Sequence, residues 1–299
     1  ISIRFGELSN ILHEANHYAQ TESKAQISSD EIQRAIEAKY YRSNLIQEKI
    51  MDLIRRKTLM IELEGSKIGQ INGISVLDLG DFKFGRPNKI TVNVASGKEG
   101  LIDIEREAKL GGPLHTKGVL ILSGYLGEKY GQDKNISLFA SLVFEQSYSE
   151  IEGDSASSAE LYAILSALSQ LPLKQWIAVS GSVNQKGEIQ PVGAINEKVE
   201  GYFEVCRQHG FNGKQGVMIP KGNMDHLMLK QEVVDAVKEG NFHVWAIGTV
   251  DEGIELLTGH PAGRRLKSGS FSKNSVHDLV DQRIQALNKV MTKKSNTKK

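Results

Sequence analysis

The chain has 299 residues, of which 39% are hydrophobic and 24% are charged. This length allows two domains, and the composition is ordinary for a globular protein. A formal net charge of +1 argues against nucleic-acid binding over the whole surface. A single cysteine excludes an intrachain disulfide framework and fits a reducing compartment.

Targeting signals are missing from the chain as given. No apolar run approaches the roughly 20 residues needed to span a bilayer. The first residues have no apolar signal-peptide core and no initiator methionine. We therefore expect a cytoplasmic protein without a membrane partner, present here as a fragment of a longer polypeptide.

Residues 1–57 carry the pattern of helices. Apolar residues recur at helical spacing along most of this stretch. Ser28 stands three residues before Glu31, which is the spacing of a capping box at a helix start. A third periodic stretch, 45–54, ends in the basic residues 55–57, which suit a helix C-terminus. We expect a small all-helical segment here.

Glycine becomes frequent after residue 64, and short β-like runs follow. The expected strands are 58–63, 74–79, 90–95, 119–122, 138–144, 176–183, 216–219 and 242–247. The expected helices between and after the later strands are 156–170, 195–209, 224–238 and 251–258. This alternation predicts an α/β (α+β) domain over 58–262.

A basic C-terminal extension follows over 263–299. It has one expected helix near 275–291 and ends in the lysine-rich tail 293–299. Such a charged tail is typically solvated and partly disordered. Contact with nucleic acid or with a partner is the alternative role for it.

A serine and a lysine in the α/β region have the setting that a Ser-Lys hydrolase needs. Ser155 follows Gly153 and Asp154 at the start of a predicted helix, and Lys198 stands 43 residues later in the first turn of another. A serine becomes a good nucleophile when a base takes its proton, and lysine can be that base when desolvation keeps its amine neutral. The apolar residues around Lys198 favour this state, and helix-terminal amides near Ser155 could hold an oxyanion.

The same residues also have structural interpretations. Ser155 and Asp154 are both common N-cap residues, and Lys198 could be an exposed lysine of a first helical turn. Asp154 or Glu152 beside Lys198 would raise the pKa of its amine, so these acids could hold a resting state. Spacing alone leaves these interpretations open.

The sequence around the two residues resembles the proteolytic domain of the Lon family, in particular its B-type and Lon-like bacterial members. Residues 144–148, FEQSY, and 152–157, EGDSAS, are similar to the nucleophile block of that family. Residues 180–194, SGSVNQKGEIQPVGA, resemble the block that leads to its catalytic lysine. The resemblance covers roughly 58–260, while 1–57 resemble the helical end of the AAA+ module that precedes the protease in Lon proteins.

This resemblance implies a serine endopeptidase with Ser155 as nucleophile and Lys198 as general base. Ser180 stands where the family often has a threonine that orients the lysine. The resemblance also implies unfolded polypeptides as substrates and a homo-oligomeric ring of six chains. The chemistry needs no metal and no cofactor in this chain. The chain has no Gly-x-x-x-x-Gly-Lys-Ser/Thr phosphate loop, so we expect ATP and Mg only if an ATPase region lies upstream.

Three alternatives are open at this point. His13, Glu14 and His17 fit the zinc-protease pattern His-Glu-x-x-His on a predicted helix, where two imidazoles can share a metal. Surface histidines on an amphipathic helix would give the same pattern. The second alternative is a Lon-fold scaffold that binds polypeptide without cleaving it. The third is nucleic-acid binding through the basic tail, which the near-neutral total charge does not favour.

Overall fold

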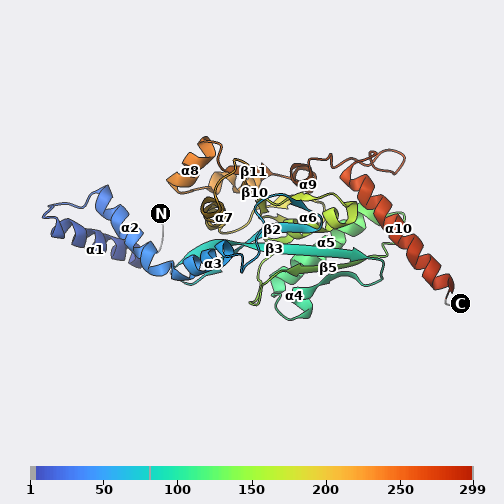
Figure 1. Cartoon of the computed structure of the whole chain (residues 1–299), viewed down its shortest axis with the longest axis horizontal. Helices are drawn as coiled ribbons and strands as arrows, with labels where there is room; N and C mark the ends of the chain where they lie inside the picture. Colours follow the sequence, from blue (N-terminus) through green and yellow to red (C-terminus); the bar gives the residue numbers. More distant parts are fainter. Residues whose placement is uncertain (1–4, 81, 298–299) are drawn as a thin grey trace.

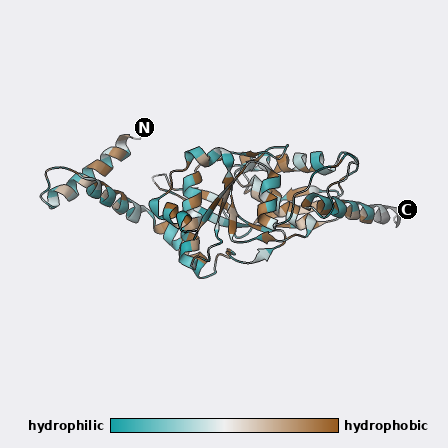
Figure 2. Cartoon of the chain, turned by 90° about the horizontal axis from the view of Figure 1, so that it is seen from above, coloured by the Kyte–Doolittle hydropathy of each residue, from teal (hydrophilic) through white to brown (hydrophobic). Residues whose placement is uncertain are grey.

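The computed structural model of the protein describes residues 5–80 and 82–297, with side chains up to Thr292. Figure 1 shows a helical hairpin that projects from one end of a central α/β body and a long C-terminal helix at the other end. Apolar residues gather in the central body, whereas the projecting helices carry many hydrophilic residues (Figure 2). The described residues include no helix that is both long and apolar enough to cross a membrane.

Three helices form the N-terminal segment, as the sequence predicts. They are α1 (Phe5–Thr21), α2 (Ser29–Ser43) and α3 (Leu45–Arg55). The capping box is confirmed, because the Ser28 hydroxyl accepts a hydrogen bond from the Asp30 N–H and the Glu31 carboxylate accepts one from the Ser28 N–H. The helix α3 packs against the α/β body through α7 (Ile195–His209).

A seven-stranded sheet in the order β11-β10-β7-β2-β3-β5-β4 forms the centre of the body. Its strands are β2 (Gln70–Asp78), β3 (Lys83–Ala95), β4 (Gly100–Asp103), β5 (Phe139–Phe144), β7 (Ile177–Val179), β10 (Gly216–Pro220) and β11 (His243–Ile247). A short hairpin joins β2 to β3, so these strands run antiparallel. The strands β7, β10 and β11 run parallel, because helices form the connections that parallel strands require.

The other elements flank this sheet. Two small ladders pair β1 (Ser66–Lys67) with β6 (Leu173–Lys174), and β8 (Ser182–Val183) with β9 (Ile189–Gln190). The remaining helices are α4 (Ile104–Glu107), α5 (Pro113–Tyr130), α6 (Ser157–Ser169), the 3-10 helix η1 (Lys221–His226), α8 (Gln231–Lys238), α9 (Val250–Thr258) and α10 (Val276–Thr297).

Side chains that alternate along the central strands enter two separate hydrophobic cores. In β7, Ile177 and Val179 belong to one core and Ala178 belongs to the other. Successive side chains of a strand point to opposite faces of its sheet, so the two cores cover opposite faces. The helix α6 lies in the first core and α7 in the second. Every residue of α6 is buried, because its small and apolar side chains pack against the sheet on one side and against other helices around it.

The strand predicted at 58–63 is wrong. This segment is irregular, and the side chain of Gln146 binds it. The Gln146 amide oxygen accepts from the Met60 N–H and its amide nitrogen donates to the Thr58 carbonyl, both at 2.8 Å. Backbone groups that bond to a distant side chain leave no signal in apolar patterning.

The strand predicted at 119–122 is also wrong, because these residues lie inside α5. A short apolar run fits a strand and a buried helix equally well, and Pro113 at the start of α5 favours the helix. Of the helix predicted at 224–238, only the second half is α8. The strand predicted at 176–183 is divided into β7 and β8. The helix predicted at 195–209 is confirmed as α7 with the same bounds, and the other predicted helices and strands are confirmed with shifted bounds.

The helix predicted near 275–291 is confirmed as α10, which continues to Thr297. Its side chains at Val280, Ile284 and Leu287 are buried in the same core as α6. The first half of α10 is therefore packed against the α/β body and is not a solvated tail. Lys298 and Lys299, at the end of the predicted tail, lie outside the described residues.

We predict that Ile284→Ala lowers the free energy of unfolding by about 2–5 kcal/mol, because it leaves a cavity in the core shared with α6. Urea denaturation followed by circular dichroism measures this change. The matched control is Arg283→Ala on the exposed side of the same helix, with an expected change within about 0.5 kcal/mol. Equal effects of the two substitutions would contradict the packing of α10.

Candidate active site

Ser155 and Lys198 line one cavity of about 460 Å³. The cavity walls come from β2 and β3, from the segment 149–156 before α6, and from the start of α7 with the loop 191–194 ahead of it. The structure thus brings together two residues that are 43 positions apart in the sequence.

Ser155 lies in the turn that precedes α6, and neighbouring backbone groups hold this turn in place. Gly181 donates its N–H to the Ser155 carbonyl at 2.8 Å, and Ser158 donates its N–H to the Gly181 carbonyl at 3.1 Å. The N-cap residue of α6 is Ala156, without a capping side chain. The interpretation of Ser155 as an N-cap is therefore wrong.

Lys198 is 3% exposed in the first turn of α7, so the interpretation as an exposed lysine is also wrong. Its burial follows from a close contact between α7 and β3. A Cβ atom on Gly85 would lie 2.6 Å from the Lys198 Cα, and one on Gly201 would collide with the Gly85 carbonyl oxygen. Only glycine at both positions allows the helix and the strand to meet in this way.

The amine of Lys198 is largely shielded from water. Burial lowers its pKa to about 8, against the opposing charges of Asp154 and Glu197, which raise it. Its Nζ donates a hydrogen bond to the Ser180 Oγ at 3.1 Å. The Ser180 hydroxyl in turn lies 3.5 Å from the Ser155 carbonyl oxygen as a donor. Ser180 therefore stands between the lysine and the backbone of the serine.

The two acids that the sequence placed near the lysine have different positions. Asp154 lines the cavity, accepts a hydrogen bond from the Ser182 hydroxyl at 2.9 Å, and raises the Lys198 pKa as expected. Glu152 also lines the cavity, but its carboxylate accepts from the Leu114 N–H at 3.3 Å, at the N-terminus of α5, where the helix dipole favours an anion.

Sequence reasoning missed several residues in and beside the cavity. Glu197, which does not line it, raises the pKa of Lys198 from the neighbouring position. Arg86 and Asn88 line the cavity from β3, and the Asn88 amide donates to the Ser75 hydroxyl at 2.7 Å. The sequence did contain one indication of Arg86 and Asn88: they are polar residues two positions apart, so in a strand they lie on the same face.

The zinc-protease pattern lies far along the chain from this cavity, on α1. His13 and His17 are exposed there. Glu14 accepts two hydrogen bonds from the Arg42 guanidinium, at 2.8 and 2.7 Å, and so joins α1 to α2. In the part of the chain that the structure describes, no three His, Cys, Asp or Glu side chains are grouped as metal ligands would be.

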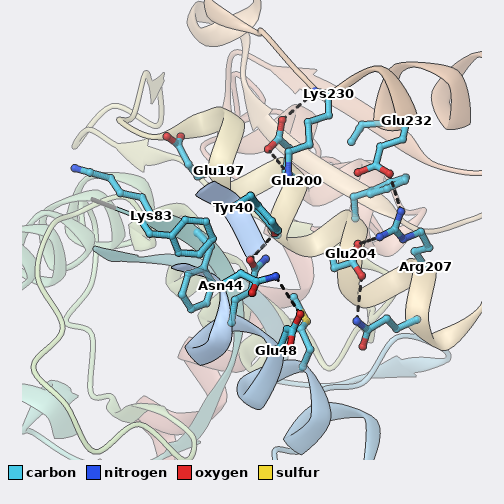
Figure 3. A pocket seen from close by; sticks show the side chains of 18 residues that line it. Tyr40, Asn44, Glu48, Lys83, Glu197, Glu200, Glu204, Arg207, Lys230 and Glu232 are labelled. Atoms are coloured by element: carbon cyan, nitrogen blue, oxygen red, sulfur yellow. Dashed lines mark hydrogen bonds and ion pairs between the residues drawn. The ribbon is translucent and has the colours of Figure 1, made fainter. Parts of the chain in front are cut away.

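A second cavity, of about 430 Å³, lies on the other side of α7, where α2 and α3 approach it. Figure 3 shows its charged lining, with Glu200 paired to Lys230, and Arg207 between Glu204 and Glu232. Glu197 lines this second cavity, whereas Lys198, the next residue, lines the first. The first turn of α7 is thus a wall between the two cavities.

Two segments of the chain match known protein families. Residues 149–258 match the Lon protease (S16) C-terminal proteolytic domain, and residues 1–42 match the archaeal LonB AAA+ ATPase LID domain. The chain belongs to the Lon protease family.

Curated relatives include a putative Lon protease homolog of Escherichia coli (strain K12), 44% identical over 232 residues, which are 77% of this chain and 40% of the relative. A putative Lon protease homolog of Haemophilus influenzae is 35% identical over 281 residues, covering 93% of this chain and 46% of the relative. An archaeal Lon protease of Pyrococcus abyssi is 27% identical over 260 residues, covering 86% and 24%. The chain therefore spans less than half the length of these relatives.

We predict that Asp154→Asn lowers the pKa of Lys198 below about 8, because the substitution removes a charge that stabilises the ammonium form. Carbon-13 NMR titration of lysine-labelled protein measures this pKa, with the Lys198 signal assigned by Lys198→Arg. The matched control is Glu152→Gln, which should leave the pKa unchanged because Glu152 binds α5. An unchanged or higher pKa in Asp154→Asn would refute the assignment.

Proposed function

We propose that this chain is the proteolytic part of a serine endopeptidase that cleaves unfolded polypeptides, with Ser155 as nucleophile and Lys198 as general base. One observation carries the proposal: Lys198 is buried in the cavity that Ser155 lines, and burial lowers its pKa to about 8. A lysine with this pKa is neutral in about one molecule in ten at pH 7, far more often than an ordinary lysine, and this neutral form can accept a proton.

The reaction would begin with attack of the Ser155 Oγ on a substrate carbonyl carbon, while Lys198 takes the hydroxyl proton. Lys198 then returns this proton to the leaving amine, and an acyl-enzyme ester forms on Ser155. Water, deprotonated by Lys198, hydrolyses the ester and restores the serine. This chemistry needs no metal and no cofactor.

Backbone amides just before α6 would hold the oxyanion of the tetrahedral intermediate. The N–H groups of Ser157 and Ser158 already donate to the carbonyls of Asp154 and Gly181, at 3.0 and 3.1 Å. We therefore assign the oxyanion to the amides of Ser155 and Ala156. Ser180 would act as a positioning residue, because its hydroxyl accepts from the Lys198 Nζ.

The wider setting of the reaction is also part of the proposal. It takes the chain as part of a cytoplasmic protease that acts as a ring of six chains, and the matches to a Lon proteolytic domain and to an AAA+ LID domain support its place among Lon proteases. If an ATPase region lies upstream of this chain, it would use ATP and Mg to unfold substrates and deliver them to the cavity.

A scaffold that binds polypeptide without cleaving it is the second candidate. The position of Asp154 favours it, because this carboxylate opposes the neutral state of Lys198. Burial is nevertheless the largest influence on the Lys198 pKa and acts in the opposite direction. The peptidase is therefore the better-supported function.

We predict that the protein hydrolyses unfolded casein without nucleotide, and that Ser155→Ala and Lys198→Ala each lower the rate at least about 10³-fold. Fluorescence of labelled casein measures the rate. A chelator should have no effect. Matched controls are Ser268→Ala and Lys186→Ala on the exposed surface. Activity that survives in Ser155→Ala would refute the mechanism, and an inactive wild-type protein would favour the scaffold.

We predict that the rate of peptide cleavage rises with pH and levels off above about pH 8. Below this pKa, Lys198 is an ammonium ion that cannot accept the serine proton, so the rate should fall about tenfold for each pH unit. Initial rates between pH 6 and 10 on a peptide without titratable groups test this. A rate that is independent of pH between 6 and 8 would contradict the role of Lys198.

A further inference from the structure

Arg86 is a half-buried cation in the wall of the catalytic cavity. It lies on β3 opposite Ser75 of β2, within the paired part of the two strands. Within residues 5–80 and 82–292, its guanidinium has neither an ion pair nor a hydrogen bond. The surrounding structure thus holds a positive charge without supplying a counter-charge.

A half-buried guanidinium without a counter-charge is unfavourable. Burial lowers the pKa of Arg86, with no acid acting in the other direction, although an arginine stays charged under physiological conditions. A partly desolvated charge is stabilised when an anion and good hydrogen bonds accompany it. The planar guanidinium fits a carboxylate with two parallel hydrogen bonds.

The acids of the cavity lie together on one wall. Glu150, Glu152 and Asp154 come from the segment that leads to Ser155, whereas Arg86 comes from the strand β3 and the second cation, Lys198, from α7. Arg86 also lines a small adjoining cavity beside Gln146, where Glu145 and Lys89 are the other charged residues. The Glu145 carboxylate accepts a hydrogen bond from the Thr91 hydroxyl and makes no ion pair with Arg86. A carboxylate that enters the catalytic cavity is thus repelled by the loop and attracted to β3.

We propose that Arg86 is a specificity-determining residue that binds a carboxylate of the polypeptide in the catalytic cavity. This inference rests on the proposed function, since it takes the same cavity as the place where substrate lies. The carboxylate could belong to an aspartate or glutamate side chain within the substrate or to the C-terminus of the peptide. These two sources offer the same chemistry to Arg86.

The test measures binding in the Ser155→Ala protein, so that it does not depend on cleavage. Three fluorescent peptides of otherwise identical sequence are compared: one with an internal aspartate and an amidated C-terminus, one with asparagine there, and the asparagine peptide with a free C-terminus. Fluorescence anisotropy at low salt gives each dissociation constant. We expect at least one carboxylate-bearing peptide to bind about tenfold more tightly than the neutral one.

Adding Arg86→Gln should remove this preference and leave the affinity for the neutral peptide unchanged, which also shows that the cavity is intact. Arg86→Lys should retain part of the preference, because the charge stays while the paired geometry is lost. The matched control is Lys98→Gln in the exposed turn after β3, which should keep the full preference. Which peptide binds more tightly identifies the source of the carboxylate.

Equal affinities of the three peptides, or a preference that survives Arg86→Gln, would overturn the inference. The outcome for the proposed function is read separately, from cleavage by the protein with Ser155 intact. A protein that cleaves casein but shows no preference for carboxylates loses only the inference on Arg86. A protein that shows the Arg86-dependent preference but does not cleave loses only the peptidase.

Discussion

The close contact between α7 and β3 is the constraint on which the rest of the site depends. Gly85 and Gly201 remove the side chains that would keep the helix and the strand apart. This contact places Lys198 at 3% exposure, and the burial in turn lowers its pKa to about 8. With an alanine at either glycine, the start of α7 would have to shift away from the sheet, and the amine would move toward water.

The first turn of α7 also connects two cavities of different character. Lys198 lines the cavity of Ser155, while Glu197 lines the charged cavity next to α2 and α3. Glu197 nevertheless raises the pKa of Lys198. The carboxylate of Glu197 thus belongs to a cavity that the N-terminal helices help to form, and its charge also acts on the amine of the next residue, Lys198.

Local chemistry explains which parts of the fold could be predicted from the sequence. The helix 195–209 was predicted with its correct bounds, because its apolar face repeats at helical spacing and Gly210 follows it. The run 119–122 was assigned to a strand because a short apolar stretch lacks a distinctive period. The irregular segment at 58–63 depends on the side chain of Gln146, which lies far along the chain. No local pattern contains such a contact.

The residues of the candidate site also differ in whether the sequence could predict them. Similarity to a family indicated Ser155, Lys198 and Ser180, and the structure brings these three close together. Arg86 and Glu197 were not predicted. The position of Arg86 depends on the pairing register of β2 and β3, and that of Glu197 on the packing of α7 against other helices. Both are tertiary features.

The burial of Lys198 places a limit on how the cavity can open. In the proposed mechanism a polypeptide must reach Ser155 through the cavity, yet each water molecule that enters with it would solvate Lys198 and favour the charged form, which cannot accept a proton. Access for a polypeptide and the neutral state of Lys198 would thus place opposite demands on the same cavity. A polypeptide that fills the cavity would resolve this opposition, because it would displace the water that came in ahead of it. In this sense an extended polypeptide would complete the dry surroundings that its own cleavage requires.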